Sequence, residues 1–389
     1  MNRGMAAGLT AGLGLGLIGI LATGLASAAY IEEEFQGARP IVRPPPPPVV
    51  EPVRPIILPP VGPHVPEVER YLVRLELGDP ISYGYLVVYP VRLRGSVLGG
   101  AWLTMDQALA RGVLAVYEKG VGSVPTVVME NRSRTEHIFI MAGELLAGGK
   151  QARTVRQDVI LAPGQRVDTA VLCVEQHRWS GDARFSAGEL LVPQSIQREL
   201  RKGAGQDAVW SEVARSNRSL GAESPTASLE AGLKAAPVQD ELARVRRAIC
   251  PRIPGQTVGF LFARGGEALG AEFFGRADLA AALLGKLLDA YAVDLVVPHK
   301  GGPAGRPGWS RGPAEALLER IRRAGSYRTA TIGSGAGIQT RALGLVGDGV
   351  GFGEDLVHYG CQVEAYGVPV PQPMPAPRPY PERENPSWR

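Results

Sequence analysis

The sequence predicts an α+β fold in which a strand-rich sheet or sandwich portion, a helical portion and a mixed portion follow one another. Three observations support this class. Residues 68–180 hold short strand-like apolar runs between turn residues, residues 190–250 change to the helical apolar period, and residues 255–367 combine both patterns. Strands and helices do not alternate regularly, so a doubly wound dinucleotide-binding fold is not expected.

The first portion is predicted to consist mainly of strands. Turn residues such as Asn131-Arg132-Ser133 separate them. The expected strands are Tyr71–Leu77, Tyr85–Leu93, Val113–Tyr117, Thr126–Glu130, His137–Met141, Val155–Leu161 and Val167–Val174. One helix interrupts them, with Thr104 as its N-cap, because a threonine side chain can accept a hydrogen bond from a free amide at a helix start.

The second and third portions supply most of the helices. From the helical apolar period, helices are expected at Ile196–Arg201, Ala208–Leu220, Ser228–Leu233, Gln239–Ile249, Asp278–Tyr291 and Pro313–Arg323. Late strands are expected at Thr257–Ala263, Ala268–Phe274, Thr329–Ile332, Arg341–Val346 and Leu356–Tyr366. All these elements are assigned to one domain, residues 68–367, which is large but single by its size of about 300 residues.

The N-terminus resembles a secretory signal peptide. Asn2 and Arg3 precede an apolar stretch, Met5–Leu25, which ends in Ala26-Ser27-Ala28. This order is typical of a segment that signal peptidase removes, so residues 1–28 are expected to be cleaved and the protein exported to the periplasm or cell envelope of a bacterium. The alternative is an uncleaved membrane anchor, since the stretch nears the roughly 20 residues that span a bilayer. Membrane contact is expected only through such an uncleaved segment.

Proline marks two flanking segments. Of the 33 prolines, twelve lie between Pro40 and Pro66 and eight from Pro369 onward. Because proline restricts φ and removes a backbone donor, residues 29–67 are predicted to form an extended polyproline II spacer, and residues 368–389 a similar tail. Docking of these segments into an aromatic-lined groove of a protein partner is the alternative.

Charge and composition exclude several classes of protein. A formal net charge of +4 over 389 residues, without a run of Lys or Arg, does not indicate nucleic-acid binding. The three cysteines are too few and too far apart for a disulfide framework, although one bridge between Cys250 and Cys361 fits an exported protein. The five histidines lack metal-ligand spacing, so no zinc site and no cofactor are expected.

The first polar cluster lies in HIFIMAGELLAGGKQARTVRQD, residues His137–Asp158, where a buried strand is expected to end. A glycine pair leads into Lys150, Gln151 and Arg153, and backbone amides beside two cations suit a phosphate or carboxylate ligand. The motif is not a P-loop, because a strand rather than a helix follows the glycines. The alternative is a tight turn in which the cations pair with Glu144 for structure.

The second polar cluster is VDTAVLCVEQHRW, residues Val167–Trp179. Alternate side chains of a strand share a face, so Cys173 and Glu175 are expected side by side near the strand end. A Cys173 thiolate activated by Arg178 is one interpretation. The other is a buried, inert cysteine under a polar rim, because the loop lacks the glycines of a cysteine-phosphatase site and Glu175 would repel an anion.

Three glycine-rich stretches occur late in the chain, at Gly265-Gly266, Gly333–Gly337 and Gly347–Gly353. The last has GxGxG spacing but leads into a strand, so no helix N-terminus would face a pyrophosphate. All three are predicted to form hairpin turns.

Four segments together carry a family resemblance: GELLAGGKQAR, CVEQHRW, AVWSEVARSNRSLGAESPT and GDGVGFGEDLVHYGCQVEAY. They resemble the ADP-ribosylglycohydrolase- and rhodanese-phosphatase-associated protein domain family of bacteria and archaea, over roughly Gly84–Tyr366. The matched polar signature is Glu144, Lys150, Gln151, Arg153, Cys173, Glu175, Arg178 and Trp179. Leu145 stands where the family often has a second acid, and Ala152 where it often has Asn, which weakens a two-carboxylate mechanism. The resemblance alone implies no particular reaction.

The two polar clusters are expected to share one pocket, because each lies where a strand ends. The candidate residues are Glu144 and Glu175 for general-base catalysis and Lys150, Gln151, Arg153, Arg178 and Trp179 for holding a ligand. The expected function is that of an exported protein binding a small anionic ligand that contains phosphate or ADP-ribose. A hydrolase acting on such a substrate and a non-catalytic envelope interaction module are the alternatives.

Overall fold

The computed structural model describes residues 62–95, 98–123, 125–222, 224–295 and 309–364. The predicted signal peptide, most of the predicted spacer and the predicted C-terminal tail lie outside these residues. Residues 62–67 are described, and His64 and Glu67 are buried, so the folded part begins slightly before the predicted start at residue 68. None of the helices in the described part of the chain is long and apolar enough to cross a membrane.

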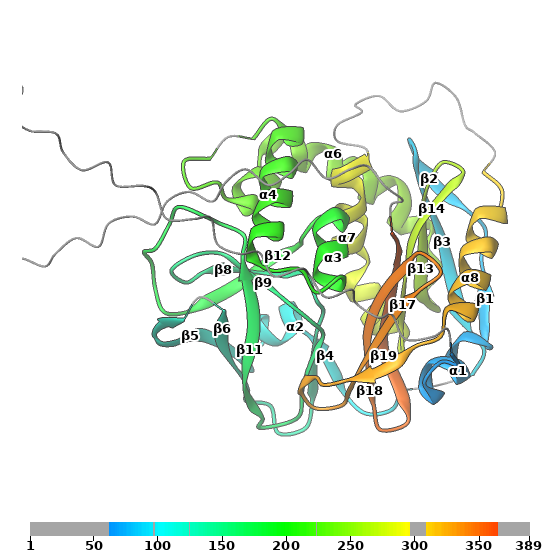
Figure 1. The fold of residues 1–389 in the computed structure, drawn as a ribbon, viewed down its shortest axis with the longest axis horizontal. Coiled ribbons are helices and arrows are strands. Elements are labelled where there is room, and N and C mark those ends of the chain that lie inside the picture. Colours follow the sequence, from blue (N-terminus) through cyan, green and yellow to red (C-terminus); the bar gives the residue numbers. More distant parts are fainter. Residues whose placement is uncertain (1–61, 96–97, 124, 223, 296–308, 365–389) are drawn as a thin grey trace, which may run out of the picture. The chain divides into compact units, whose positions relative to one another are not determined.

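The described residues form an α+β fold, as the sequence predicts, with eight α-helices and three sheets (Figure 1). The largest sheet has nine strands in the order β1-β3-β13-β14-β19-β18-β17-β15, with β2 paired to β3. Its strands are β1 Leu75–Leu77, β2 Ile81–Tyr83, β3 Leu86–Leu93, β13 Thr257–Arg264, β14 Glu267–Phe274, β15 Tyr327–Thr329, β17 Ala336–Ala342, β18 Leu345–Phe352 and β19 Asp355–Val363.

Two smaller sheets hold most of the strand-rich first portion. The four-stranded sheet has the order β16-β10-β7-β4, and the six-stranded sheet has the order β12-β8-β9-β11-β6-β5. Their strands are β4 Trp102–Thr104, β5 Leu114–Ser123, β6 Thr126–Asn131, β7 His137–Ile140, β8 Glu144–Gly148, β9 Arg153–Val155, β10 Val159–Leu161, β11 Arg166–Cys173, β12 Phe185–Leu191 and β16 Ile332–Gly333. The parallel pairing of β10 with β16 connects this portion to the C-terminal portion.

Helices cover both faces of the nine-stranded sheet (Figure 1). One face carries α6 (Ala236–Ile249) and α7 (Ala277–Leu295), and the other carries α1 (Pro66–Leu72) and α8 (Gly312–Ala324). Side chains along β3 alternate between the two cores. Leu86 and Val88 pack on the α7 side of the sheet, and Val87, Tyr89 and Val91 pack on the α8 side. Most residues of α7 are buried, which fits a helix with apolar residues on most of its surface.

The remaining helices are α2 Met105–Ala110, α3 Gln194–Arg201, α4 Gln206–Leu220 and α5 Leu229–Leu233, with a short 3₁₀ turn at Cys250–Arg252. Of these helices, α2 and α4 contact strands of the smaller sheets, α3 contacts β18 of the large sheet, and α5 packs on α4 and α6. The predicted N-cap of α2 is confirmed, because the Gln107 amide donates to the Thr104 hydroxyl at 3.5 Å and the Thr104 amide donates to Gln107 Oε1 at 3.0 Å.

Several predicted strands differ in the structure, and among them the expected strand Thr329–Ile332 is divided between the end of β15 and the start of β16. Of the expected strand Tyr71–Leu77, only Leu75–Leu77 forms a strand, β1, and Tyr71 and Leu72 end α1. Pro66 starts this helix, and its apolar face packs on the large sheet. The expected strand Val155–Leu161 is divided into β9 and β10, and the turn at residues 156–158 between them exposes polar side chains to a pocket. A local apolar pattern does not reveal such a break, since the two halves pair with different sheets.

The glycine-rich stretches also differ in part from expectation. Gly265 and Gly353 occupy turns with positive φ, as predicted. The alternate glycines from Gly347 to Gly351, by contrast, lie within β18 and let neighbouring strands and side chains approach closely. The expected strand Arg341–Val346 contains the turn between β17 and β18, with Leu343 at a φ of 53°.

All three cysteines are free. Cys250 packs against the core on the α7 side of the large sheet, whereas Cys361 belongs to the core on the α8 side. The single bridge considered from the sequence therefore does not form, because the sheet separates the two thiols.

Candidate functional site

Glu175 and Arg178 hold together the loop that follows β11. Glu175 Oε2 accepts hydrogen bonds from Arg178 Nε at 2.9 Å and from the Ala152 amide at 3.0 Å. Its Oε1 accepts from the Thr226 hydroxyl at 2.8 Å, and Arg178 also donates to three backbone carbonyls. Burial alone would raise the pKa of Glu175, but the bonds from Arg178, Ala152 and Thr226 hold it below its usual value. Both carboxylate oxygens are thus engaged in holding the loop.

Arg153 is fully buried beside Cys173. Its Nη1 donates to the Gln151 carbonyl at 3.3 Å and to Gln151 Oε1 at 3.2 Å, and its Nη2 lies 3.6 Å from Glu118 Oε1. The Cys173 thiol donates to Gln151 Oε1 at 3.3 Å, and burial raises the pKa of Cys173 against the pull of Arg153. The covered thiol stays protonated, which fits the interpretation of an inert cysteine.

Trp179 lies over two of the predicted cations. The centroid of one ring is 5.3 Å from Lys150 Nζ and 5.6 Å from Arg153 Cζ, and the Trp179 side chain is 48% exposed. The structure therefore brings six of the seven predicted site residues into one neighbourhood: Lys150, Gln151, Arg153, Glu175, Arg178 and Trp179.

Glu144, the seventh predicted residue, lies at the other end of β8 from the glycine pair. Its Oε1 accepts from Lys286 Nζ of α7 at 2.7 Å, and its Oε2 accepts from the Met141 amide at 2.9 Å. Lys286 also lies 2.6 Å from Asp106 Oδ2 of α2. Burial would lower the pKa of Lys286, but the two carboxylates raise it. Glu144 thus belongs to a buried ion cluster that joins three elements, rather than to the neighbourhood of Trp179.

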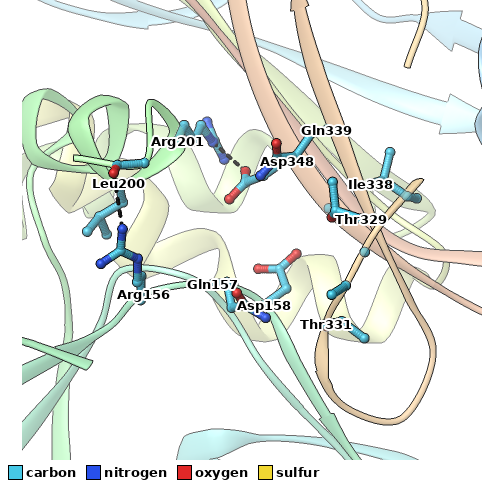
Figure 2. A pocket seen from close by; sticks show the side chains of 14 residues that line it. Arg156, Gln157, Asp158, Leu200, Arg201, Thr329, Thr331, Ile338, Gln339 and Asp348 are labelled. Carbon is cyan, nitrogen blue, oxygen red and sulfur yellow. Dashed lines mark hydrogen bonds and ion pairs between the residues drawn. The ribbon is translucent and has the colours of Figure 1, made fainter. Parts of the chain in front are cut away.

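A separate polar cavity of about 180 Å³ opens where the turn between β9 and β10, the end of α3 and strands β15 to β18 meet (Figure 2). Its charged lining residues are Arg156, Asp158, Arg201 and Asp348. Figure 2 shows the carboxylates of Asp158 and Asp348 directed toward the same open space. We call this cavity the Asp158–Asp348 pocket.

The floor of the pocket is held by Arg201, the last residue of α3. Its Nη1 and Nη2 donate to the two carboxylate oxygens of Glu272 on β14 at 3.0 and 2.8 Å, and its Nε donates to Asp348 Oδ1 at 2.7 Å. A glycine makes room for this fork: Gly360 of β19 is paired in register with both Glu272 and Asp348 on the flanking strands. Any side chain at Gly360 would overlap the guanidinium.

His358 connects this floor to the pocket wall. It lies two residues before Gly360 and so faces the same side of β19. Its Nδ1 is 2.6 Å from Asp158 Oδ2 and its Nε2 is 3.1 Å from Glu272 Oε2. Burial would lower the pKa of His358, but the Asp158 and Glu272 carboxylates raise it to about 10. The ring is therefore a buried imidazolium that donates to a carboxylate on each side.

The two carboxylates that face the cavity differ in their surroundings. Asp158 accepts from His358 and, through Oδ1, from the Ala142 amide at 2.9 Å. Asp348 is bound through Oδ1 alone, and within the described residues its Oδ2 has no hydrogen-bond partner. Burial and the nearby charge of Asp158 raise the pKa of Asp348 against the pull of Arg201. One carboxylate is firmly held, and the other keeps an oxygen open to the cavity.

Arg156 contributes a cation at the pocket edge. Its Nη2 donates to the Gly203 carbonyl at 3.0 Å, which is its one hydrogen bond among the described residues. The rest of its fork of donors stays available to an anionic group of a ligand. Across the residues that the structure describes, no group of three or more His, Cys, Asp and Glu side chains is suited to hold a metal ion.

The sequence motifs contain several residues of the pocket and its floor, but the patterns predict no role for them. Asp158 ends the first polar cluster, and Asp348, His358 and Gly360 lie in the closing glycine-rich motif. One signal was available: along β19 the residues at 358, 360 and 362 read His, Gly, Gln, which places polar groups on one face of a strand inside a sheet. Arg201 had no local signal, since basic residues are common at helix ends.

Comparison with known proteins identifies the family. A family model described as the ARG and Rhodanese-Phosphatase-superfamily-associated Protein domain, ARPP-1, matches residues 74–361. The chain belongs to this family. The resemblance expected from the sequence is thereby confirmed, and the ARPP-1 match spans both the Trp179 neighbourhood and the Asp158–Asp348 pocket. No curated protein and no solved structure matches the chain.

Proposed function

We propose that this ARPP-1 protein is an exported ligand-binding protein and that its ligand is a sugar-containing molecule bound in the Asp158–Asp348 pocket. The observation that supports this most directly is that two carboxylates face one small cavity whose edge carries a guanidinium with open donors. Carboxylates accept hydrogen bonds from sugar hydroxyls, and a guanidinium binds phosphate.

The charge of the pocket suits such a ligand. Three cations, Arg156, Arg201 and His358, balance three carboxylates, Asp158, Glu272 and Asp348. A balanced site does not attract a highly charged anion by its net field, but it offers many directed donors and acceptors. Neutral hydroxyl groups in the cavity, with one anionic group at Arg156, match this arrangement.

The size of the pocket supports a small ring. A cavity of about 180 Å³ is smaller than the roughly 300–1,000 Å³ of pockets for drug-sized ligands. It holds one five- or six-membered ring with its hydroxyls rather than a whole dinucleotide. A ribose ring with a phosphate directed toward Arg156 is the portion of an ADP-ribose-like ligand that fits.

The Trp179 neighbourhood supports an anion site less well. Arg178 donates to Glu175 and to three carbonyls, and Arg153 is fully buried. Binding an anion there would require these bonds to break, and the carboxylates Glu118 and Glu175 would oppose it. We therefore assign the ligand to the Asp158–Asp348 pocket.

Export rests on the sequence pattern of residues 1–28, and it makes its own prediction. Intact-mass measurement of the protein recovered from the periplasm or medium of an expressing bacterium is expected to give a chain that starts at Ala29. Recovery of the full-length chain in the cytoplasm alone would contradict export, without bearing on the pocket.

Ligand binding is tested by calorimetry on the full chain with ribose 5-phosphate, ribose, ADP-ribose and inorganic phosphate. Thr331→Phe, which places a ring at the pocket lining, is expected to abolish binding of the sugars. Arg156→Ala is expected to weaken binding of the phosphorylated ligands by roughly 10- to 100-fold and to leave ribose binding unchanged, since a charge-assisted hydrogen bond contributes roughly 1.5–3 kcal/mol.

Two matched controls and one rival site complete this test. Thr135→Phe and Arg132→Ala change the same residue types on the exposed surface, and both are expected to bind like the wild type. Trp179→Ala reports on the Trp179 neighbourhood. Binding lost in Trp179→Ala but retained in Thr331→Phe would place the ligand at Trp179 and overturn the proposal, as would the absence of binding by all four ligands.

A further inference from the structure

We infer that the Asp158–Asp348 pocket hydrolyses a glycosidic bond, with Asp348 as proton donor to the leaving group and Asp158 as proton acceptor from water. This inference rests on the proposed binding of a sugar ring in the pocket. It adds a reaction, a bond type and a role for each carboxylate.

The geometry separates the two carboxylates into different tasks. Both oxygens of Asp158 accept hydrogen bonds from buried donors, the Ala142 amide and the His358 ring, and these bonds fix the position of the carboxylate. Asp348 has one oxygen on Arg201 and directs the other into the cavity. A proton on that free oxygen would point at a bound ligand.

The electrostatics agree with these tasks. Burial and the charge of Asp158 raise the pKa of Asp348, which favours its protonated form. The His358 imidazolium faces Asp158 and Glu272, and Arg201 faces Glu272 and Asp348. A general acid needs a proton on an oxygen that faces the ligand, and the position and the raised pKa of Asp348 meet both conditions.

The reaction balances without a further reactant. The proton on Asp348 passes to the oxygen or nitrogen of the leaving group as its bond to the anomeric carbon breaks. The oxygen of a water molecule bonds to the anomeric carbon, and one of its protons passes to Asp158. Solvent then returns a proton to Asp348 and takes one from Asp158. The sugar leaves with a free anomeric hydroxyl, and no group is oxidised or reduced.

Charge development favours a glycosidic bond over a phosphate ester. The anomeric carbon gains positive charge in the transition state, and carboxylates directed at it are stabilising. A phosphoryl group would bring negative oxygens toward the same two carboxylates, which is unfavourable. Arg156, the cation with open donors, lies at the edge of the pocket, where it can hold a remote phosphate rather than the reacting bond.

The test uses the full chain with two kinds of glycoside that differ in the leaving group. Methyl ribosides have a leaving group that needs a proton, whereas p-nitrophenyl ribosides release a stabilised phenolate that needs little help. Both anomers of each are assayed by release of ribose or p-nitrophenolate.

Asp348→Asn is expected to lower kcat for the methyl riboside by about 100-fold or more, within the roughly 10²–10⁴ that general acids contribute. The loss for the p-nitrophenyl riboside is expected to be below about tenfold, because the aryl leaving group needs no acid. The variant removes the acid proton but keeps a polar side chain of nearly the same shape, so its loss in kcat for the methyl riboside is expected to exceed its loss in affinity for ribose 5-phosphate at least tenfold. The fall of wild-type activity at high pH, from loss of the Asp348 proton, is expected to vanish.

The controls and outcomes distinguish the two proposals. Asp168→Asn changes an exposed carboxylate on β11 that pairs with Lys119, and it is expected to act like the wild type. Binding of ribose 5-phosphate without cleavage of any glycoside would overturn the hydrolytic inference and leave the binding proposal intact. Cleavage that Asp348→Asn lowers equally for both leaving groups would overturn the acid assignment. Failure of every ligand to bind would overturn both proposals.

Discussion

The guanidinium of Arg201 occupies the space above Gly360, where any other residue would place a side chain. Gly360 is paired in register with Glu272 on one neighbouring strand and with Asp348 on the other. The missing side chain lets one arginine from a helix reach both carboxylates at once. A glycine of the closing motif thus serves an ion pair rather than a turn.

Gly360→Ala is expected to displace Arg201 and to leave Glu272 without its bidentate partner. Breaking a buried ion pair commonly costs about 3–5 kcal/mol, so a loss of that order in the free energy of unfolding is expected from urea denaturation. Gly255→Ala is the matched control, because nothing lies within 4 Å of a side chain added there. Equal stability of the two variants would show that the guanidinium can move at little cost.

The pH dependence of stability is expected to report on His358. Its pKa in the folded chain is about 10, above the ordinary 6.5, so its protonation stabilises the fold fully below about pH 6.5. This contribution is lost as the pH rises from 6.5 toward 10, by an amount of a few kcal/mol at about 1.4 kcal/mol per unit. Urea denaturation at intervals across this range measures it.

His358→Gln is expected to flatten that pH dependence as well as to lower stability, because glutamine carries no proton to lose. His177→Gln is the matched control, since His177 is exposed on the loop beside Trp179. A wild-type stability that stays constant between pH 6.5 and 10 would argue against a buried imidazolium between Asp158 and Glu272.

Glu144 is expected to act in stability and not in ligand binding. Lys286→Met leaves Glu144 and Asp106 buried without a cation and should cost about 3–5 kcal/mol of unfolding free energy. Glu144→Gln should lower the free energy of unfolding by less, because Lys286 keeps Asp106 as an ionic partner. The affinity of the Glu144→Gln variant for ribose 5-phosphate should match that of the wild type. Lys234→Met, which removes an exposed pair with Glu230, is the control and should be nearly neutral. Loss of binding in a folded Glu144→Gln variant would restore Glu144 as a site residue.

Arg178→Ala is expected to loosen the loop that carries Trp179. The change removes the partner of Glu175 and frees three backbone carbonyls, so hydrogen exchange of residues 176–184 should accelerate while the rest of the chain keeps its protection. Arg218→Ala, on the exposed side of α4, should leave that loop unchanged. Arg178→Lys should resemble the alanine variant, because lysine lacks the planar fork that reaches these acceptors together. Unchanged exchange in Arg178→Ala would show that other contacts hold the loop.

Most of the fold could be predicted because each element carries its own pattern. The central helices and strands such as β3 and β14 follow from apolar periods that depend only on neighbouring residues. The errors occur where a partner decides the local structure. The residues after Val155 continue a strand pattern, but the chain turns there because β9 and β10 pair with different sheets. The start of α1 was missed for the same reason, since its helix is stabilised by packing on the large sheet.

The candidate site could be predicted only in part. Glu175 and Arg178 are three residues apart, so the sequence places them in one polar cluster, but their ion pair is seen only in the structure. Glu144 and Arg153 occur in one motif, yet Glu144 starts β8 and Arg153 starts β9, and their side chains reach different partners. A motif shows which polar residues are present, but the length and direction of the strands decide which of their side chains come into contact.

The sequence by itself determined the α+β class, the buried character of Cys173 as one of two interpretations, and membership in the ARPP-1 family. These depend on periodicity, residue chemistry and motif identity, all of which can be read from residues that are close together in the sequence. Only the tertiary structure decided the Asp158–Asp348 pocket, because its parts come from distant positions: His358 and Asp158 are 200 residues apart, and Arg201 and Asp348 are 147 apart. Contacts over such separations arise from sheet register and helix packing, which no local pattern encodes.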